Sequence, residues 1–401
     1  MRTALCIALG IVCLAPLALA ADAPAGYWNC FRGPHQGVAA SDNAPVDWDG
    51  PSGRGVVWKA PLKMGGVSSP IVWGDHVYLT EGNDRERAVM AFDAATGKQL
   101  WRQVVPDGAN GQPRPAVSDS GLALPTPVAD ADGVYALFGT GDLAAFTHQG
   151  KPKWKLFIQR PQLGYGFASS PCIAEHLVLI QFDCLADGRV LAVDTNTGQI
   201  KWNIDRARGA SWSSPIIIPG ADGTPMFVAN ASGSITAFDL TGSVVWDLDG
   251  VTGEVTPSPA YTDGHVYAVN VGSTLLCLRA TCDPGEQWRY GKNLSDTSSP
   301  VALGGMVFML GGNGKLACVN AETGQEFWAQ QSPGCYASLV ASGDRVYALS
   351  RQGTTEIVEA KPTYRLIAKC ELGEGSDATP AIADGRIYIR TRGHLWCLGT
   401  K

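Results

Sequence analysis

A repeated unit of about 44 residues runs along most of this 401-residue chain and constrains its fold more than any other feature. Each unit begins with two small residues and a proline, as at Ser68-Ser69-Pro70, and continues into a short apolar strand. Successive anchors are 39 to 57 residues apart, and they lie at Pro70, Pro127, Pro171, Pro215, Pro259, Pro300, Leu339 and Pro380. The chain is therefore built from eight similar units rather than from two or three unrelated domains.

The residues that follow each anchor predict four short strands. In the first unit, residues 74–78 (Gly-Asp-His-Val-Tyr) form a turn and open the second strand, and residues 91–93 (Ala-Phe-Asp) end the third. A Thr-Gly turn follows, in which the Asp side chain can cap backbone amides and Gly97 can adopt a positive φ. Apolar residues alternate and turns recur every 8–12 residues, which excludes helical repeats of similar length. We expect an all-β protein, an eight-bladed β-propeller of four-stranded antiparallel blades.

Tryptophans open the fourth strands, where a large ring can pack against the neighbouring blade and bury about 150–250 Å². The seventh unit lacks one, because Ala368 or Lys369 takes that place. The eighth unit ends before its fourth strand, and residues 56–59, which include Trp58, precede the first anchor. We predict that this N-terminal strand completes the last blade and removes an exposed edge. The structural docking residues are then Trp58, Trp101, Trp154, Trp202, Trp246, Trp288 and Trp328.

The N-terminus is typical of a secretory signal. Arg2 precedes an apolar run that ends in Ala18-Leu19-Ala20, so we expect cleavage near Ala20. Residues 1–20 are then a signal peptide, 21–55 an N-terminal lead-in and 56–401 the propeller. We expect an exported protein, periplasmic or secreted, without a lipid anchor, because no lipoprotein-type triplet precedes Cys6 or Cys13. No later stretch is long and apolar enough to span a bilayer.

The charge and the cysteine content indicate which partners and which disulfides can be expected. With 31 basic and 37 acidic residues and no Lys/Arg cluster, the chain is not expected to bind nucleic acid. Nine cysteines remain after the signal, an odd number, so they cannot all pair internally. Cys277 and Cys282 are close enough in sequence for a disulfide. Alternatively, Cys277 fills a slot that other units fill with Ala, where it would serve as a small buried hydrophobe. We expect a monomer.

Two motifs carry a family resemblance. The pattern Ala-x-Asp-x-x-Thr-Gly-x-x-x-Trp, at 91–101 and 192–202, resembles the tryptophan-docking repeat of the pyrroloquinoline-quinone (PQQ)-like propellers. The stretch Trp-Asn-Cys-Phe-Arg-Gly-Pro at 28–34 is similar to the lead-in of exported BamB-like proteins. The resemblance implies a non-catalytic scaffold that binds a protein or peptide partner in the cell envelope, at a blade edge or across one face, and that needs no cofactor.

The same superfamily implies an alternative, a PQQ-dependent quinoprotein dehydrogenase that oxidises alcohols or sugars with PQQ and calcium. The chain has no adjacent cysteine pair, no Cys-x-x-Cys-His haem motif and no segment that matches the family's calcium and base motifs. We therefore assign no catalytic residue and no metal ligand, and favour a protein that is not an enzyme. A carbohydrate- or polymer-binding surface protein is a third hypothesis, based on aromatic loops alone.

Any binding site should lie where the repeat varies. The loops before each anchor and those between the second and third strands vary most, and we expect both sets to open onto one face around the pore. The insert between Pro106 and Pro125 is the best candidate for a specialised loop. The candidate partner-binding residues at the pore mouth are Tyr165, Phe167, Trp212, Glu254, Asp296, Tyr336, Arg351 and Asp377.

Overall fold

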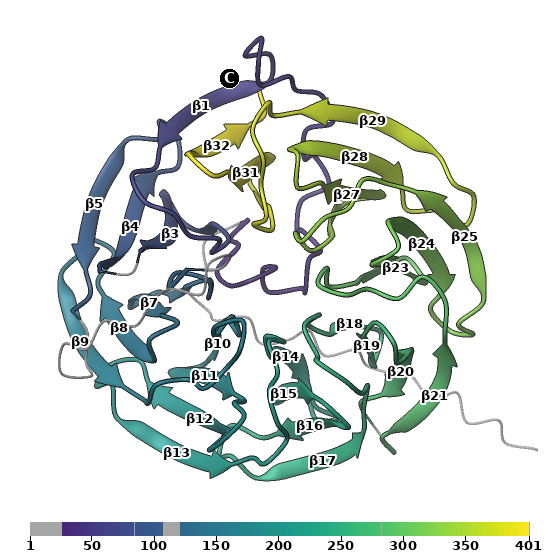
Figure 1. The fold of residues 1–401 in the computed structure, drawn as a ribbon, viewed down its shortest axis with the longest axis horizontal. Coiled ribbons are helices and arrows are strands. Elements are labelled where there is room, and N and C mark those ends of the chain that lie inside the picture. The colour runs from purple at the N-terminus through teal and green to yellow at the C-terminus, as the bar shows by residue number, and fades with distance from the viewer. Residues whose placement is uncertain (1–25, 84, 107–120, 282, 401) are drawn as a thin grey trace, which may run out of the picture.

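The computed structural model describes residues 26–83, 85–106, 121–281 and 283–400. In this part of the chain, thirty-two strands form eight four-stranded antiparallel sheets arranged as blades around a central pore (Figure 1). The eight-bladed propeller predicted from the repeat is confirmed. The signal-like segment and most of the insert after Pro106 lie outside the described residues.

Blades 1 to 4 each consist of four strands consecutive in sequence. Their bounds are β2 (Ile71–Trp73), β3 (His76–Gly82), β4 (Arg87–Asp93), β5 (Gln99–Val104); β6 (Val128–Asp130), β7 (Gly133–Leu137), β8 (Asp142–Phe146), β9 (Pro152–Phe157); β10 (Cys172–Ala174), β11 (Leu177–Phe182), β12 (Arg189–Asp194), β13 (Ile200–Asp205); β14 (Ile216–Pro219), β15 (Pro225–Ala231), β16 (Ser234–Phe238) and β17 (Val244–Asp249).

Blades 5 to 7 follow the same order, and blade 8 combines the two ends of the chain. Their bounds are β18 (Ala260–Thr262), β19 (His265–Val269), β20 (Leu275–Arg279), β21 (Gly285–Tyr290); β22 (Val301–Leu303), β23 (Met306–Leu310), β24 (Lys315–Asn320), β25 (Glu326–Gln331); β26 (Val340–Ser342), β27 (Arg345–Leu349), β28 (Thr354–Glu359), β29 (Leu366–Glu371); β30 (Ala381–Ala383), β31 (Arg386–Arg390), β32 (His394–Leu398) and β1 (Val56–Pro61).

The predicted closure of the ring by the N-terminal strand is also confirmed. Strand β1 pairs antiparallel with β32, with Trp58 opposite Cys397 and Ala60 opposite Leu395. Just beyond the strands, the Gly399 amide donates to the Gly55 carbonyl at 2.9 Å. The two ends of the chain therefore share one sheet, so blade 8 has the same four strands as the others.

The tryptophans fasten each blade to the next. Seven indole Nε1–H groups donate to a backbone carbonyl of the following blade, at 2.8–3.1 Å. The turn that receives the ring needs glycine for two reasons. Gly97 has a φ of +73°, and a Cβ there would lie 2.5 Å from the Trp58 ring. The pairs are Trp58–Ala94, Trp101–His148, Trp154–Thr195, Trp202–Leu240, Trp246–Ala280, Trp288–Ala321 and Trp328–Lys361.

Blade 7, which has no docking tryptophan of its own, is covered by the lead-in. Trp48 is only 1% exposed and belongs to the buried cluster against which Ala368 packs. The adjoining backbone bonds to β29, since Gly50 donates to the Glu371 carbonyl at 2.7 Å. A tryptophan from outside the repeat thus fills the interface that the repeat leaves short of a large side chain.

Within the described ranges, the structure contains no helix long and apolar enough to cross a membrane.

Candidate functional site

A closed ring of hydrogen bonds lines the pore at the start of the innermost strands. The middle residue of every anchor triplet is Ser or Thr, and its amide donates to the hydroxyl of the next blade's middle residue at 2.8–3.1 Å. The bond from Thr379 to Ser69 closes the circle. The ring consists of Ser69, Thr126, Ser170, Ser214, Ser258, Ser299, Ser338 and Thr379. The repeated hydroxyl therefore has a structural role in joining blades.

The lead-in crosses the pore and bonds to blades on all sides of it (Figure 1). We name residues 28–38 the pore plug. Trp28 forms an antiparallel bridge with Val72 of blade 1, and Val38 a parallel bridge with Ala341 of blade 7. Two side chains reach further blades: Asn29 Nδ2 donates to the Ala129 carbonyl of blade 2 at 2.9 Å, and Gln36 Nε2 to Ile217 of blade 4 at 3.2 Å.

Arg32 is the centre of the plug. Its guanidinium is 1% exposed and donates to the carbonyls of Pro259 in blade 5, at 2.8 Å, of Pro300 in blade 6, and of Gln36. Burial lowers the pKa of Arg32 to about 9, so it remains charged at pH 7. Its backbone adopts a left-handed φ of +63°. Backbone carbonyl oxygens thus stabilise this buried charge through hydrogen bonds.

The two variable loop sets meet on one face of the propeller, as expected. Loops before the anchors bond to loops between the second and third strands, for example Gly139 to the Leu122 carbonyl and Gly312 to the Leu294 carbonyl. We call this the loop face. The lead-in contacts the opposite ends of the blades, where Arg345 donates to the Ala44 carbonyl at 3.2 Å, and this is the plug face. One mouth of the pore is therefore occupied by the chain itself.

Three of the predicted site residues form one cluster on the loop face. Arg351 donates through Nε and Nη2 to the two carboxylate oxygens of Asp377, at 2.7 and 3.2 Å. Its guanidinium also lies 3.9 Å from the centre of the Tyr336 ring, which is 49% exposed. The ion pair and the cation–π contact hold the three side chains in one arrangement.

Tyr165 and Trp212 form a second cluster. Tyr165 lies in the loop before blade 3, and Trp212 lies in the loop before blade 4. The rings of Tyr165 and Trp212 are 5.7 Å apart, and Trp212 Nε1 donates to the Gly166 carbonyl at 2.8 Å. Tyr165 is 65% exposed, whereas Trp212 is buried, so only Tyr165 of this pair is accessible at the pore mouth.

The other predicted site residues do not belong to these two clusters. Phe167 is fully buried against Phe182, with ring centres 4.7 Å apart, so assigning it to an accessible pore mouth was wrong. A loop residue can be apolar because it packs inward, and the sequence pattern does not distinguish the two orientations. Glu254 and Asp296 are exposed but belong to neither cluster.

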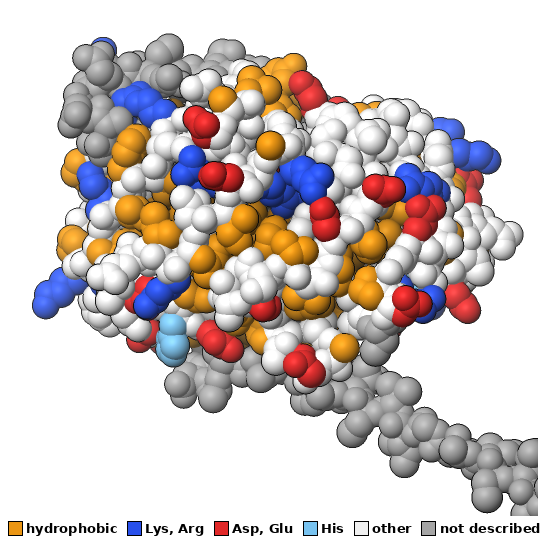
Figure 2. Space-filling model, turned by 90° about the horizontal axis from the view of Figure 1, so that it is seen from below, with side chains coloured by type: hydrophobic (Ala, Val, Ile, Leu, Met, Phe, Trp, Pro, Cys, Tyr) orange, Lys and Arg blue, Asp and Glu red, His pale blue; other side chains and the backbone are white. Residues whose placement is uncertain are grey.

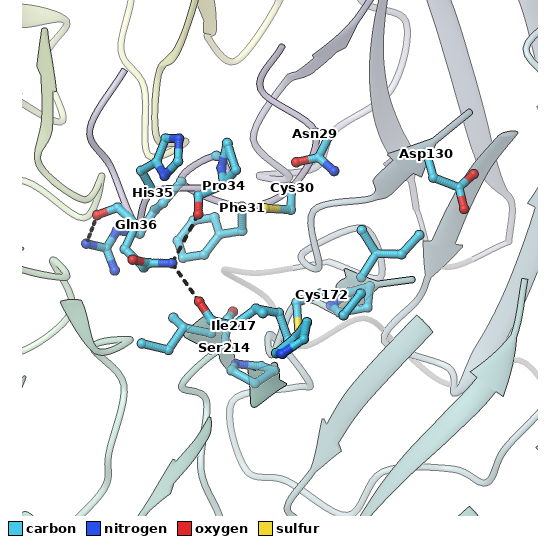
Figure 3. A pocket seen from close by; sticks show the side chains of 18 of the residues that line it. Asn29, Cys30, Phe31, Pro34, His35, Gln36, Asp130, Cys172, Ser214 and Ile217 are labelled. Carbon is cyan, nitrogen blue, oxygen red and sulfur yellow. Dashed lines mark hydrogen bonds between the residues drawn. The ribbon is translucent and has the colours of Figure 1, made fainter. Parts of the chain in front are cut away.

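The residues around the pore plug also line a cavity of about 280 Å³ on the plug face (Figure 3). The plug contributes Cys30, Phe31 and Pro34, and blades 3 and 4 contribute Cys172 and Ile217. The repeat does not predict this site, because the plug that forms part of its wall has no counterpart in the repeated units. The non-repeating motif at 28–34 was the signal that could have found it.

The outer strands form a third exposed surface, the outer rim. Figure 2 views the part of the rim that lies at the lower edge of Figure 1, where apolar side chains gather in a band between charged ones. Val244 and Val245 of β17 and Ile200 of β13 are about half exposed. An outermost strand with exposed apolar residues and an unpaired edge is a place where another strand can add.

Few side chains of the described residues could take part in metal binding or thiol chemistry. Within these ranges, no three His, Cys, Asp or Glu side chains gather in a way that could hold a metal ion. Cys277 is a free, buried thiol, and burial raises its pKa to about 12. This is against the disulfide that the spacing left open, although Cys282 itself lies outside the described residues.

Sequence comparison with known proteins identifies related proteins. The sequence model of the family described as "Outer membrane protein assembly factor BamB" matches residues 31–181 and 186–401. The chain is 26% identical over 311 residues to the outer membrane protein assembly factor BamB of Yersinia pestis, a match that covers 73% of this chain and 70% of the relative.

Two solved structures share the fold. BamB from Moraxella catarrhalis superposes with a TM-score of 0.66 at 16% identity, over 86% of this chain and 97% of that one. The quinohemoprotein alcohol dehydrogenase from Comamonas testosteroni gives a TM-score of 0.65 at 14% identity, over 94% and 81%. At such low identity these two likenesses concern the fold alone. The family match covers most of the sequence, and the chain belongs to the outer membrane protein assembly factor BamB family.

Proposed function

We propose that this protein is an exported, non-catalytic scaffold that binds a protein partner in the cell envelope through its loop face. The observation that carries the proposal is the cluster of Arg351, Tyr336 and Asp377, in which an exposed aromatic ring and a guanidinium are fixed in advance. Arg, Tyr and Trp are the residue types that contribute most to binding energy at protein interfaces. Fixing them before binding reduces the entropy that association costs.

The plug supports the choice of face. The opposite mouth of the pore is filled by the pore plug, while Tyr165 and Tyr336 remain 65% and 49% exposed on the loop face. Family membership supports the class of partner, since the relatives are named as outer membrane assembly factors. The outer rim is the competing surface for a partner.

Site-specific photocrosslinking in cells tests the proposal. A photoreactive phenylalanine analogue is placed at Tyr336 or Tyr165 on the loop face, and at Ile200 on the outer rim as a control of comparable exposure. We expect the loop-face positions to yield one discrete envelope protein that belongs to the outer-membrane assembly machinery. Arg351→Glu should abolish that product. Equal products from all three positions, or a product from Ile200 alone, would contradict the proposal.

The quinoprotein alternative is supported by likeness of fold alone, for example to the Comamonas enzyme. Calcium in proteins takes six to eight oxygen ligands, often from several carboxylates. The described residues bring no such group together, so we derive no reaction step through PQQ or calcium. Calorimetry with PQQ and calcium, combined with dye-linked oxidation of alcohols and sugars, tests it directly. Micromolar binding together with oxidation would replace the scaffold proposal.

A further inference from the structure

The cavity on the plug face is the feature that the proposed function leaves unexplained. It lies between the pore plug and blades 3 and 4, and its walls include Phe31, Ile173 and Ile217. Its volume of about 280 Å³ lies just below the range of about 300–1,000 Å³ for drug-sized ligands. A ligand of one aromatic ring system with a short chain suits such a space.

Two polar atoms of the wall lack a hydrogen-bond partner, the acceptor Oδ1 of Asn29 and the donor Nε of Arg32. The Asn29 side chain is 9% exposed, and its Nδ2 is used by the Ala129 carbonyl at 2.9 Å. Its Oδ1 has no hydrogen-bond partner. In Figure 3 this oxygen lies on the side of Cys30, another residue of the cavity wall. A buried, unpaired acceptor favours a ligand that brings a hydrogen-bond donor.

The charges of the wall favour a cation. Glu175, in the turn between β10 and β11, contributes an exposed carboxylate to the cavity lining. Arg32 also lines the cavity; its Nη1 and Nη2 donate to carbonyls of the plug and of blades 5 and 6, whereas its Nε has no partner. Burial lowers the pKa of His35, so its imidazole is neutral at pH 7. The described lining residues thus include two carboxylates, of Asp130 and Glu175, and one cation, Arg32, around an apolar space.

We propose that this cavity binds a small aromatic amine, with the ring among Phe31, Ile173 and Ile217 and the ammonium group donating to acceptors of the wall. The site is independent of the proposed scaffold function, because it lies on the opposite face of the ring.

Titration followed by fluorine NMR tests the site with three matched probes. These are 5-fluorotryptamine, which is cationic, its neutral alcohol analogue 5-fluorotryptophol, and anionic 5-fluoroindole-3-acetate, each added to the whole mature chain at pH 7. We expect the amine to bind up to about fivefold more tightly than the alcohol, since one exposed ion pair is worth at most about that factor. The acid should bind most weakly. Equal affinity for amine and alcohol, or no binding of the amine at millimolar concentration, would overturn the proposal.

Two variants locate the binding. Ile173→Trp should fill the cavity and remove binding of all three probes, and its melting temperature shows whether the ring still folds. Glu175→Gln changes only an exposed side chain and should reduce the preference for the amine over the alcohol. Glu254→Gln, an exposed carboxylate of the loop face, is the matched control and should leave the preference unchanged. If Glu175→Gln and Glu254→Gln behave alike, the amine does not bind at this cavity.

Discussion

Arg32 shows how one side chain can join parts of the ring that are distant in sequence. Its guanidinium donates to carbonyls of the plug, of blade 5 and of blade 6, where water is excluded. Arg32→Met would leave these acceptors unpaired, and we expect the free energy of unfolding to fall by about 3 kcal/mol. Denaturant unfolding measures the loss. Arg54→Met removes an exposed ion pair from the same lead-in and should lower the free energy of unfolding far less, because solvent screens that pair. Similar losses for the two variants would show that Arg32 does not anchor the plug.

Asp194 illustrates the turn residue that recurs in the blades. The Thr197 amide and hydroxyl both donate to its Oδ1 at 2.9 Å, and these bonds lower the pKa of Asp194 to about 2. A carboxyl group stabilises the fold when its pKa is lower in the folded state than in the unfolded state. This contribution is complete at pH values above the unfolded-state pKa, and it is lost as the pH falls through the folded-state pKa. The stabilising contribution of Asp194 is therefore complete above about pH 5 and disappears towards pH 2.

Asp194→Asn should accordingly be less stable than the parent at pH 7, with a difference that shrinks steadily from pH 5 to pH 2. Urea unfolding of both proteins across this range measures it. Thr197→Val removes the hydroxyl donor to this carboxylate and keeps the amide donor, so a second Asp194→Asn change in that background should show a smaller pH-dependent difference. A difference that stays constant with pH would contradict the assigned hydrogen bonds.

At the scale of the elements, Trp48 replaces the tryptophan that blade 7 lacks. It is 1% exposed and packs in the cluster that joins blades 7 and 8. We expect Trp48→Ala to lower the free energy of unfolding by about 3–5 kcal/mol, as for other buried Trp-to-Ala changes. Hydrogen exchange should accelerate first in β29 and β1. Val245→Ala, on the exposed rim, should change stability by less than about 0.5 kcal/mol. Uniform exchange across all blades in Trp48→Ala would show that Trp48 does not act at this interface.

The same interface explains what the sequence could and could not predict. The repeat predicts the number of strands, the positions of the turns and the pairing of the Trp58 strand with the last blade. It can do so because each unit packs against its neighbours in the same way. Trp48 and Arg32 have no counterpart in the repeat, so their positions depend on how the whole ring encloses its pore. Phe167 lies in a loop whose sequence is variable, and only the three-dimensional packing reveals that it faces Phe182. Residues outside the repeated pattern are therefore the least predictable, and they form the plug and its cavity.

For the whole molecule, β1 and the rest of the lead-in have separable roles. Strand β1 completes blade 8 through its pairing with β32, whereas residues 26–55 fill the pore mouth and cover blade 7. Both carry stabilising contacts, but only β1 removes the free edge of the ring.

Two truncations distinguish these roles. A chain beginning at Val56 keeps β1, and we expect it to form a closed ring that unfolds cooperatively at a lower denaturant concentration. A chain beginning at Met64 also lacks β1, so β32 keeps an unpaired edge, and we expect loss of cooperative unfolding together with self-association. Calorimetry and light scattering measure the two properties. Because β1 is antiparallel to β32, joining residues 56–61 after Thr400 through a short Asn-Gly turn should restore the shorter chain to a cooperative monomer. If the chain that begins at Met64 is as cooperative and monomeric as the one that begins at Val56, β1 is not what closes the ring.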